Sequence, residues 1–450
     1  MLKWTLNIRY AWQKTWKLIP VALFFPSLLT AQQSEKDSLI QQATLANCVH
    51  YAITHNPDLK NARLDEDITE AAIKIRLADW FPQVNLNYIL QHNFQLPTAN
   101  FNGSVIHTGS DNTSGLQVGA TQNIFNRDLL LASRSSKDVR LQSQQNTREQ
   151  NISIAAMVSK AFYDVLLTRQ QINVTEQDIS RIDSSLKDAY YQYQGGIVDK
   201  TDYLRATISL NNAKAQKKFY DEGIKAKFAY LKELMGYPVS QNFNLVYDTL
   251  KMTDEVILDT LENVNYSNRI EVQLLETQKK LQQYNLQYYK WSFLPEVSAF
   301  GNYNLNFLNN QFSKLYGQSY PNSFAGISLG IPIFQGGKRL QQIKQAELQV
   351  SQVDNSITSI QHTINTQYQQ ALAAYKSNLY NYTSLKENLS LANEVYGVIQ
   401  LQYKSGIKAY IEVINAESDL RTAQINYYNA LYQLLSSKVD VQQSLGNIEY

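Results

Sequence analysis

The feature that most constrains the fold is an internal duplication. The segment YQGGIVDKTDYLRATISLNNAK at residues 193–214 corresponds to YKSGIKAYIEVINAESDLRTAQ at residues 403–424. Earlier in each half, the block FPQV corresponds to LPEV, and VGATQNIF corresponds to ISLGIPIF. The members of each pair lie about 210 residues apart, so the sequence predicts two similar repeats in one protomer, at residues 32–250 and 251–450.

Each half contains two segments in which apolar and polar residues alternate. The alternation covers residues 84–91 and 116–121 in the first half, and residues 297–307 and 325–333 in the second. A period of two is typical of β-strands with one apolar face. Strands of roughly ten residues match a membrane barrel, in which the apolar face meets lipid. Half-buried hairpins of a soluble sandwich would give the same alternation.

Two long segments lack the residues that end helices. Residues 120–194 contain neither glycine nor proline, and residues 338–403 contain only one glycine, Gly397. In the second segment apolar residues recur with a mean step of about 3.5 residues, the period of a coiled coil. At about 1.5 Å per residue, about 65 residues would form a helix about 100 Å long. Glycines follow both segments, so we predict that each helix reverses there into a helical hairpin.

The first 31 residues have the features of a secretory signal peptide. Basic residues precede an apolar stretch at residues 18–29, and Ala31 stands before a polar stretch. We expect cleavage after Ala31, so that the mature chain leaves the cytoplasm. Beyond this point no stretch reaches the roughly 18 apolar residues that a membrane-spanning helix needs.

Composition and spacing argue against nucleic-acid binding and catalysis. A net charge of +2 gives no basic surface for nucleic acid. The single cysteine, Cys48, excludes an internal disulfide and is expected to be a small buried helix residue. The separation of His50 and His55 suits one helix face poorly, so no metal site is predicted. Without a Ser–His–acid set or a phosphate-binding loop, we expect neither an enzyme nor a cofactor.

In the order and spacing of its blocks, the chain resembles the TolC-type outer-membrane efflux proteins, also called outer membrane factors. The blocks are LANCVHYAITHNPDLKNAR, FPQV, LPEV, FQGGKR and YKSGIKAYIEVINAESDL, and the resemblance covers nearly all of the mature chain. It implies an α+β membrane protein in which each repeat has a helix, two strands, a long helix and a returning helix. Three chains would close one 12-stranded β-barrel and one antiparallel α-helical coiled-coil tunnel.

The number of strands also favours three copies. Four strands leave open edges whose backbone groups lipid cannot satisfy, so further chains must close the sheet. Eight strands enclose an interior that side chains largely fill, whereas twelve leave room for water. A water-filled conduit in outer-membrane lipid therefore favours a homotrimer.

The resemblance implies a passive exit duct of a tripartite efflux or type I secretion system. A periplasmic adaptor (membrane fusion) protein and an inner-membrane pump of the RND or ABC type would deliver cargo to it. The duct would lie in the outer membrane of a Gram-negative bacterium, with a long periplasmic extension, and its cargo could be drug, metal or protein. The alternative is an exported structural or adhesive coiled-coil protein without a pore, which would leave the alternating segments without a purpose.

The resemblance places candidate gate residues just beyond the tips. Glu412 and Asn415 occupy two positions that are usually acidic, and Asp202 holds the matching place in the first half. Tyr403 and Lys408 match a tyrosine and an arginine that, in the family, link across to the position of Asp202. Three copies of each acidic position would form a ring of charge in the tunnel, and Asn415 weakens the inner of these rings. Lys408 offers a point charge where an arginine would make two parallel hydrogen bonds. Solvated helix faces also commonly carry such charges.

The resemblance further implies that the hairpin tips dock the adaptor. The tip residues are Gly195, Gly196, Ile197, Gly406 and Ile407. The glycines would be needed to shape the turns in any case, so both roles are compatible with them.

Overall fold

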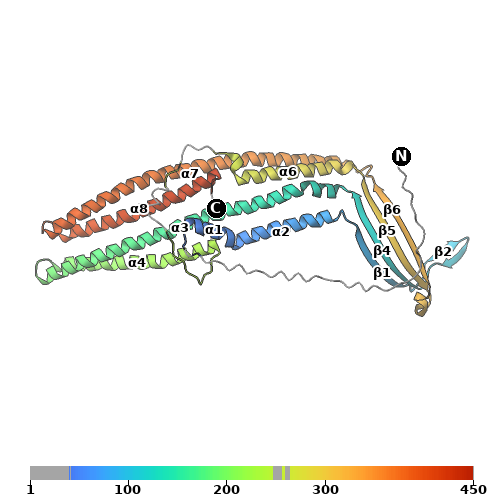
Figure 1. Ribbon diagram of the computed structural model, residues 1–450, viewed down its shortest axis with the longest axis horizontal. Coiled ribbons are helices and arrows are strands. Elements are labelled where there is room, and N and C mark those ends of the chain that lie inside the picture. The colour runs from blue at the N-terminus through green and yellow to red at the C-terminus, as the bar shows by residue number, and fades with distance from the viewer. Residues whose placement is uncertain (1–39, 41, 247–255, 259–263, 449–450) are drawn as a thin grey trace, which may run out of the picture. The chain divides into compact units, whose positions relative to one another are not determined.

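The computed structural model of the chain describes residues 40, 42–246, 256–258 and 264–448. The predicted signal peptide lies outside these residues, as does the predicted boundary between the two repeats at residues 250 and 251. The repeat boundaries therefore stay predictions. Figure 1 shows four strands side by side at one end of the long helices and the two hairpin tips at the other end.

Both halves of the chain have the same order of elements. The first half contains α1 (Leu45–His55), α2 (Pro57–Ala78), β1 (Gln83–His92), β4 (Asn112–Phe125), α3 (Arg127–Gln194) and α4 (Lys200–Met235). The second contains η1 (Tyr266–Asn268), α6 (Ile270–Lys290), η2 (Trp291–Phe293), β5 (Glu296–Asn309), β6 (Ser319–Gly330), α7 (Lys338–Lys404) and α8 (Tyr410–Leu445). The predicted sequence of a helix, two strands, a long helix and a returning helix is thus present twice.

Short polar side chains and glycines define the helix ends. Asn126 accepts a hydrogen bond from the backbone amide of Asp128 and so begins α3, while Asp199 caps α4 in the same way. Such caps satisfy amides that lack a partner inside the helix. At the other ends, α4 and α8 stop at Gly236 and Gly446, both in the left-handed conformation.

The four long strands form one antiparallel sheet in the order β1-β4-β5-β6. Leu86 lies opposite Val118, and Val118 lies opposite Tyr303, so the predicted apolar positions share one face. Within the described part of the chain, the outer edges of β1 and β6 have no partner strand. The sheet is therefore open at both edges in a single chain.

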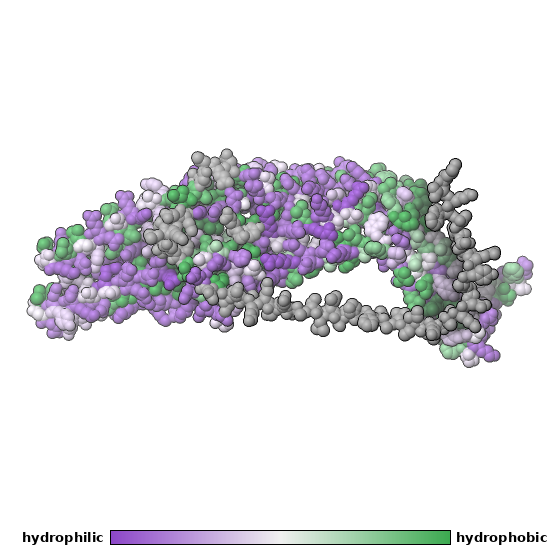
Figure 2. Space-filling view, viewed as in Figure 1, coloured by the Kyte–Doolittle hydropathy of each residue, from purple (hydrophilic) through white to green (hydrophobic). Residues whose placement is uncertain are grey.

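Apolar side chains gather at the sheet end of the chain. Figure 2 shows them over the strands and the junction with the helices, whereas the visible helical surface is largely polar. Exposed apolar side chains on the two edge strands include Val84, Leu86, Tyr88, Leu90, Ile327 and Leu329. This distribution is the one expected for strands that meet lipid.

The segments between the paired strands contain further elements. Residues 95–114 include a small hairpin of β2 (Thr98–Phe101) and β3 (Ser104–His107). Its turn residues Asn102 and Gly103 both have positive φ, 50° and 83°, as a two-residue hairpin turn requires. In the other loop lies η3 (Phe312–Gly317). The strand predicted at residues 325–333 ends at Gly330, because Pro332 cannot donate a ladder hydrogen bond.

The long helices pair as antiparallel hairpins, α3 with α4 and α7 with α8. The buried apolar residues of α7 are Ala346, Val353, Ile364, Tyr368, Tyr375 and Tyr382. They follow one another at steps of 7, 11, 4, 7 and 7 residues, and steps of four and seven are those of a coiled-coil seam. The predicted period and the predicted helix length are both confirmed.

The main hydrophobic core lies where α1, α3, α4, α7 and α8 meet. Its largest buried side chains include Phe162 from α3 and Leu434 from α8. Tyr375 of α7 extends the core by donating a hydrogen bond to the carbonyl of Val256 at 2.7 Å and accepting one from the amide of Leu258 at 3.0 Å. This core packs the two hairpins together near their middle.

The two tips have the same backbone geometry. Gly196 and Gly406 have φ of 70° and 75°, a conformation that residues with a side chain adopt at a cost. In the first turn the amide of Ile197 donates to the carbonyl of Gln192 at 2.9 Å, and the corresponding bond in the second turn has the same length. The predicted hairpin reversals are confirmed, and the sequence repeat there is a repeated turn.

Two glycine-to-alanine substitutions distinguish a glycine that the turn requires from a glycine at an ordinary helix position. Around Gly406 a new methyl group would meet open space, so only the positive φ opposes Gly406→Ala. We expect a loss of about 1 kcal/mol in unfolding free energy. Gly397→Ala, inside α7, should instead stabilise by about 0.5–1 kcal/mol. Urea unfolding followed by circular dichroism measures both, and effects of the same sign would contradict this explanation.

Candidate gate at the hairpin tips

The predicted tip residues lie at the far ends of the two hairpins. Ile197 and Ile407 are 76% and 72% exposed, and they occupy equivalent places in the two turns. The two turns thus present the same aliphatic side chain to their surroundings.

The predicted acidic positions lie in the first turns of the returning helices. Asp202 is half-buried in the first turn of α4, and Glu412 is exposed in the first turn of α8. Asn415 is also exposed and lies one turn further on the same face of α8 as Glu412. The carboxylates of Asp202 and Glu412 are favoured at these places because the amino end of a helix carries partial positive charge.

Among the described residues, Tyr403 makes the side-chain hydrogen bond between the two hairpins that lies nearest to the tips. Its hydroxyl donates a hydrogen bond to the side-chain oxygen of Gln192 at 3.2 Å, which joins α7 to α3. Burial raises the pKa of Tyr403, and the carboxylates of Asp188 and Asp202 raise it further. Asp202 is thus a neighbour of this hydroxyl, while the hydrogen-bond partner is Gln192, which the sequence reasoning missed. Lys408 is exposed, and no ion pair joins it to the described residues of its own chain.

A small apolar cluster packs the four helix ends together just above the tips. Ala189 of α3, Ala206 of α4, and Tyr410 and Val413 of α8 are buried in it. Tyr403 of α7 packs on its edge, with its ring 5.6 Å from that of Tyr410. The cluster and the Tyr403 link together hold the two hairpins side by side.

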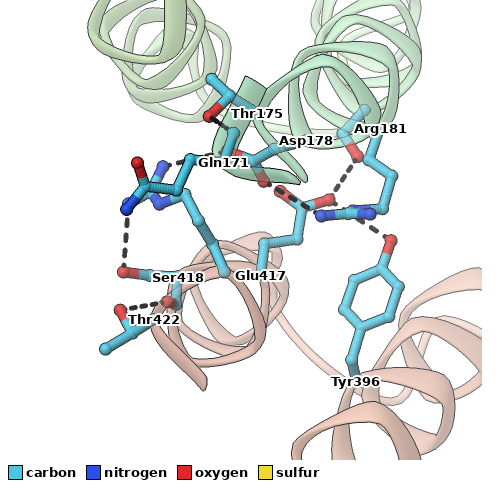
Figure 3. Close-up of polar contacts among 10 residues, drawn as sticks. Gln171, Thr175, Asp178, Arg181, Tyr396, Glu417, Ser418 and Thr422 are labelled. Carbon is cyan, nitrogen blue, oxygen red and sulfur yellow. Dashed lines mark hydrogen bonds and ion pairs between the residues drawn. The ribbon is translucent and has the colours of Figure 1, made fainter. Parts of the chain in front are cut away.

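A buried polar cluster, which the sequence reasoning also missed, surrounds Asp178. At a rise of about 1.5 Å per residue, Asp178 lies about 25 Å from the first tip. Figure 3 shows the side chains of this cluster pointing toward one another between the helices. Asp178 of α3 is fully buried. It pairs with Arg181 of the same helix at 3.3 Å and with Arg421 of α8 at 3.0 Å. The second pair joins one hairpin to the other.

Glu417 of α8 is the second acid of this cluster. It is only 4% exposed, and its carboxylate accepts hydrogen bonds from the hydroxyls of Ser185 and Tyr396, both at 3.4 Å. Burial raises the pKa of Glu417 to about 7, and the Asp178 carboxylate adds to the effect. This side chain therefore changes charge near neutral pH.

A sequence signal for this cluster did exist. Asp178 lies on the buried stripe of α3 between Val174 and Ile182, and Glu417 lies on that of α8 between Val413 and Leu420. An acid at a core position of a coiled coil is unusual because burying a charge is costly unless it is paired. The acidic residues within these buried stripes, and not the spacing of the stripes, are the sequence feature that identifies the site.

The remaining sequence predictions concern chemistry. Cys48 is fully buried in α1 as expected, and burial raises the pKa of its thiol to about 12. In the described residues no cluster of three or more His, Cys, Asp or Glu side chains could hold a metal ion. The described helices also include none that is both long and apolar enough to span a bilayer.

Comparison with known proteins agrees with the twofold architecture. The family model described as outer membrane efflux protein matches residues 48–237 and 265–447. The outer membrane protein OprJ of Pseudomonas aeruginosa is 24% identical, over 91% of this chain and 85% of that protein. The outer membrane protein TolC of Escherichia coli is 20% identical, over 94% of this chain and 86% of that protein.

Solved structures share the fold. The outer membrane protein VceC of Vibrio cholerae gives a TM-score of 0.70 at 12% identity, covering 89% of this chain and 96% of that one. The open-state MtrE outer membrane channel of Neisseria gonorrhoeae gives 0.70 at 17% identity, covering 89% and 88%. The predicted fold class is confirmed: the described residues contribute one four-stranded sheet, so that a closed barrel exists only in a trimer. The chain belongs to the outer membrane efflux protein family.

Proposed function

We propose that the chain is the outer-membrane exit duct of a tripartite efflux or type I secretion system. The observation that carries this proposal is that one chain joins an open apolar-faced sheet to two helices, each about 100 Å long. Lipid requires the sheet to close with further copies, and the helices continue the closed sheet as a tunnel. The duct carries cargo passively, and no catalytic step is assigned to it.

The partners follow from the two ends of the duct. A homotrimer places three pairs of tips, each with Ile197 and Ile407 exposed, at the periplasmic end. We assign this ring, with the turn glycines Gly195, Gly196 and Gly406, as the docking surface for a periplasmic adaptor protein. The adaptor couples the duct to an inner-membrane pump of the RND or ABC type, and that pump selects the cargo.

Next to this ring, the first turns of the returning helices α4 and α8 form the narrow part of the duct. Three copies of Glu412, with Asp202 behind them, give a collar of negative charge that favours cations and repels anions. Asn415 leaves the next layer uncharged. The hydrogen bond between Tyr403 and Gln192 holds the two hairpins of each copy together and so keeps the collar narrow. Lys408 is free to pair with a neighbouring copy.

Planar-bilayer recording on the detergent-purified mature protein tests this function. A duct closed at its tips should give small openings that prefer cations. A soluble species without conductance would contradict the proposal and leave an exported coiled-coil fibre as the better interpretation. The comparisons give no support to that fibre.

Replacing Glu412 tests the charged collar. Glu412→Gln should weaken cation preference, measured as the reversal potential in a salt gradient. Asp419→Asn is the matched control, because Asp419 is exposed and lies seven residues further along the same face of α8. In a wider part of the tunnel, salt screens charge within about 10 Å at 0.1 M, so this control should have little effect. Equal effects of the two variants would place the selective ring elsewhere.

Removing one hydroxyl group tests the link. Tyr403→Phe deletes the hydrogen bond to Gln192 and leaves the ring packing in place. Loss of about 1 kcal/mol should raise the ratio of open to closed states about fivefold. Single-channel open probability measures this ratio. Tyr380→Phe, which changes an exposed tyrosine of the same helix, should leave the open probability unchanged. An unchanged open probability in Tyr403→Phe would show that this hydrogen bond does not hold the gate closed.

A further inference from the structure

The buried cluster around Asp178 lies between the two hairpins, where a coiled coil normally has apolar contacts. Two ion pairs join α3 to α8 in the described part of the chain. Lys160 pairs with Asp440 beside the central core, and Arg421 pairs with Asp178 nearer the tips. The Asp178–Arg421 pair is thus the last ionic contact between the hairpins before the apolar cluster at the tips.

We propose that Asp178, Arg181, Arg421 and Glu417 form a proton-sensitive latch that sets how readily the two hairpins of one copy separate. The inference rests on the proposed duct function and adds to it a regulated positioning contact, distinct from the link at Tyr403. None of these four residues belongs to the charged collar or to the docking surface.

Asp178 lies where it can hold the two hairpins together. Its carboxylate is fully buried on α3, and one oxygen faces Arg181 of its own helix while the other faces Arg421 of α8. Moving α8 away from α3 would leave Asp178 with one guanidinium instead of two. Removing one partner from a buried charge is costly, so the pair opposes separation.

The carboxylate of Glu417 is poorly solvated. The groups that face it are Asp178, Arg181 and Ser185 from α3, Tyr396 from α7, and Tyr410 from its own helix α8. Both hydroxyl hydrogen bonds to its carboxylate are long, at 3.4 Å, and therefore weak. A buried carboxylate with weak donors and an acidic neighbour favours its protonated form.

The direction of the pH effect follows from these contacts. In the packed state the pKa of Glu417 is raised to about 7, whereas a hydrated glutamate has its ordinary pKa near 4.5. Protonation therefore stabilises the packed state, and this contribution is fully present below about pH 4.5 and is lost as the pH rises through about 7. At higher pH a charge remains buried in the packed state, and separation of the hairpins relieves it. The latch should therefore be tight in acid and loose at alkaline pH.

The test is a series of bilayer recordings of the mature protein at pH 5, 6, 7 and 8. The wild-type ratio of open to closed states should rise by about tenfold or more between pH 5 and pH 8. Glu417→Gln keeps the shape and removes the charge, so it should stay at the low-pH ratio throughout. Asp419→Asn, an exposed acid two residues away, should follow the wild type.

The outcomes separate the latch from the duct. Wild-type protein that never conducts would contradict the proposed function itself. Conducting protein in which Glu417→Gln retains the wild-type pH profile would overturn the latch and leave the duct intact. A profile that flattens in Glu412→Gln instead would assign the pH response to the collar.

A second variant tests the ionic contact independently of pH. Arg421→Gln leaves Asp178 with Arg181 alone, so openings should be more frequent at every pH, and Arg421→Lys should restore part of the closed state. Spin labels at Ile197→Cys and Ile407→Cys, with Cys48 fully buried, report the same separation as a distance between the tips. An unchanged distance distribution in Arg421→Gln would contradict the latch. If Arg421→Gln does not assemble, the Glu417→Gln profile alone decides.

Discussion

The unpaired edges of β1 and β6 are the constraint on which the rest of the structure depends. A backbone amide or carbonyl in lipid must have a partner, and a four-stranded sheet leaves one edge on each side without any. Pairing β1 with β6 of a second copy continues the antiparallel order, and a third copy closes the ring. Because each strand continues into a helix, the helices inherit the spacing of the strands and form the wall of a tunnel.

The helices meet a different requirement, because they are about 100 Å long and lie in water. Buried residues of α7 at seven-residue intervals, such as Tyr368, Tyr375 and Tyr382, form the seam between helices around the middle of the long helix. Near the tips the seam changes in character. There the polar residues Asp178 and Glu417 replace apolar ones, so contact between the hairpins depends on charge and on pH. The apolar part of the tunnel wall and its pH-sensitive part near the tips thus both use buried positions of the coiled-coil repeat.

Much of this architecture could be predicted from the sequence, because it rests on periodicity and on glycine. The long helices followed from the absence of breakers, and the tips followed from Gly196 and Gly406, whose positive φ the structure confirms. The hairpin of β2 and β3 was not predicted, although the Asn-Gly pair of its turn is visible in the sequence. Gln192 was also missed, because a hydrogen bond between two hairpins depends on their register against each other, which neither hairpin encodes alone.

Electron cryo-microscopy of the mature protein in a lipid nanodisc tests the central claim most directly. The account predicts three copies around one axis, with β1 of each copy paired to β6 of the next and the six hairpins converging at the tips. A monomer, or an assembly in which the edges of β1 and β6 remain unpaired, would contradict it.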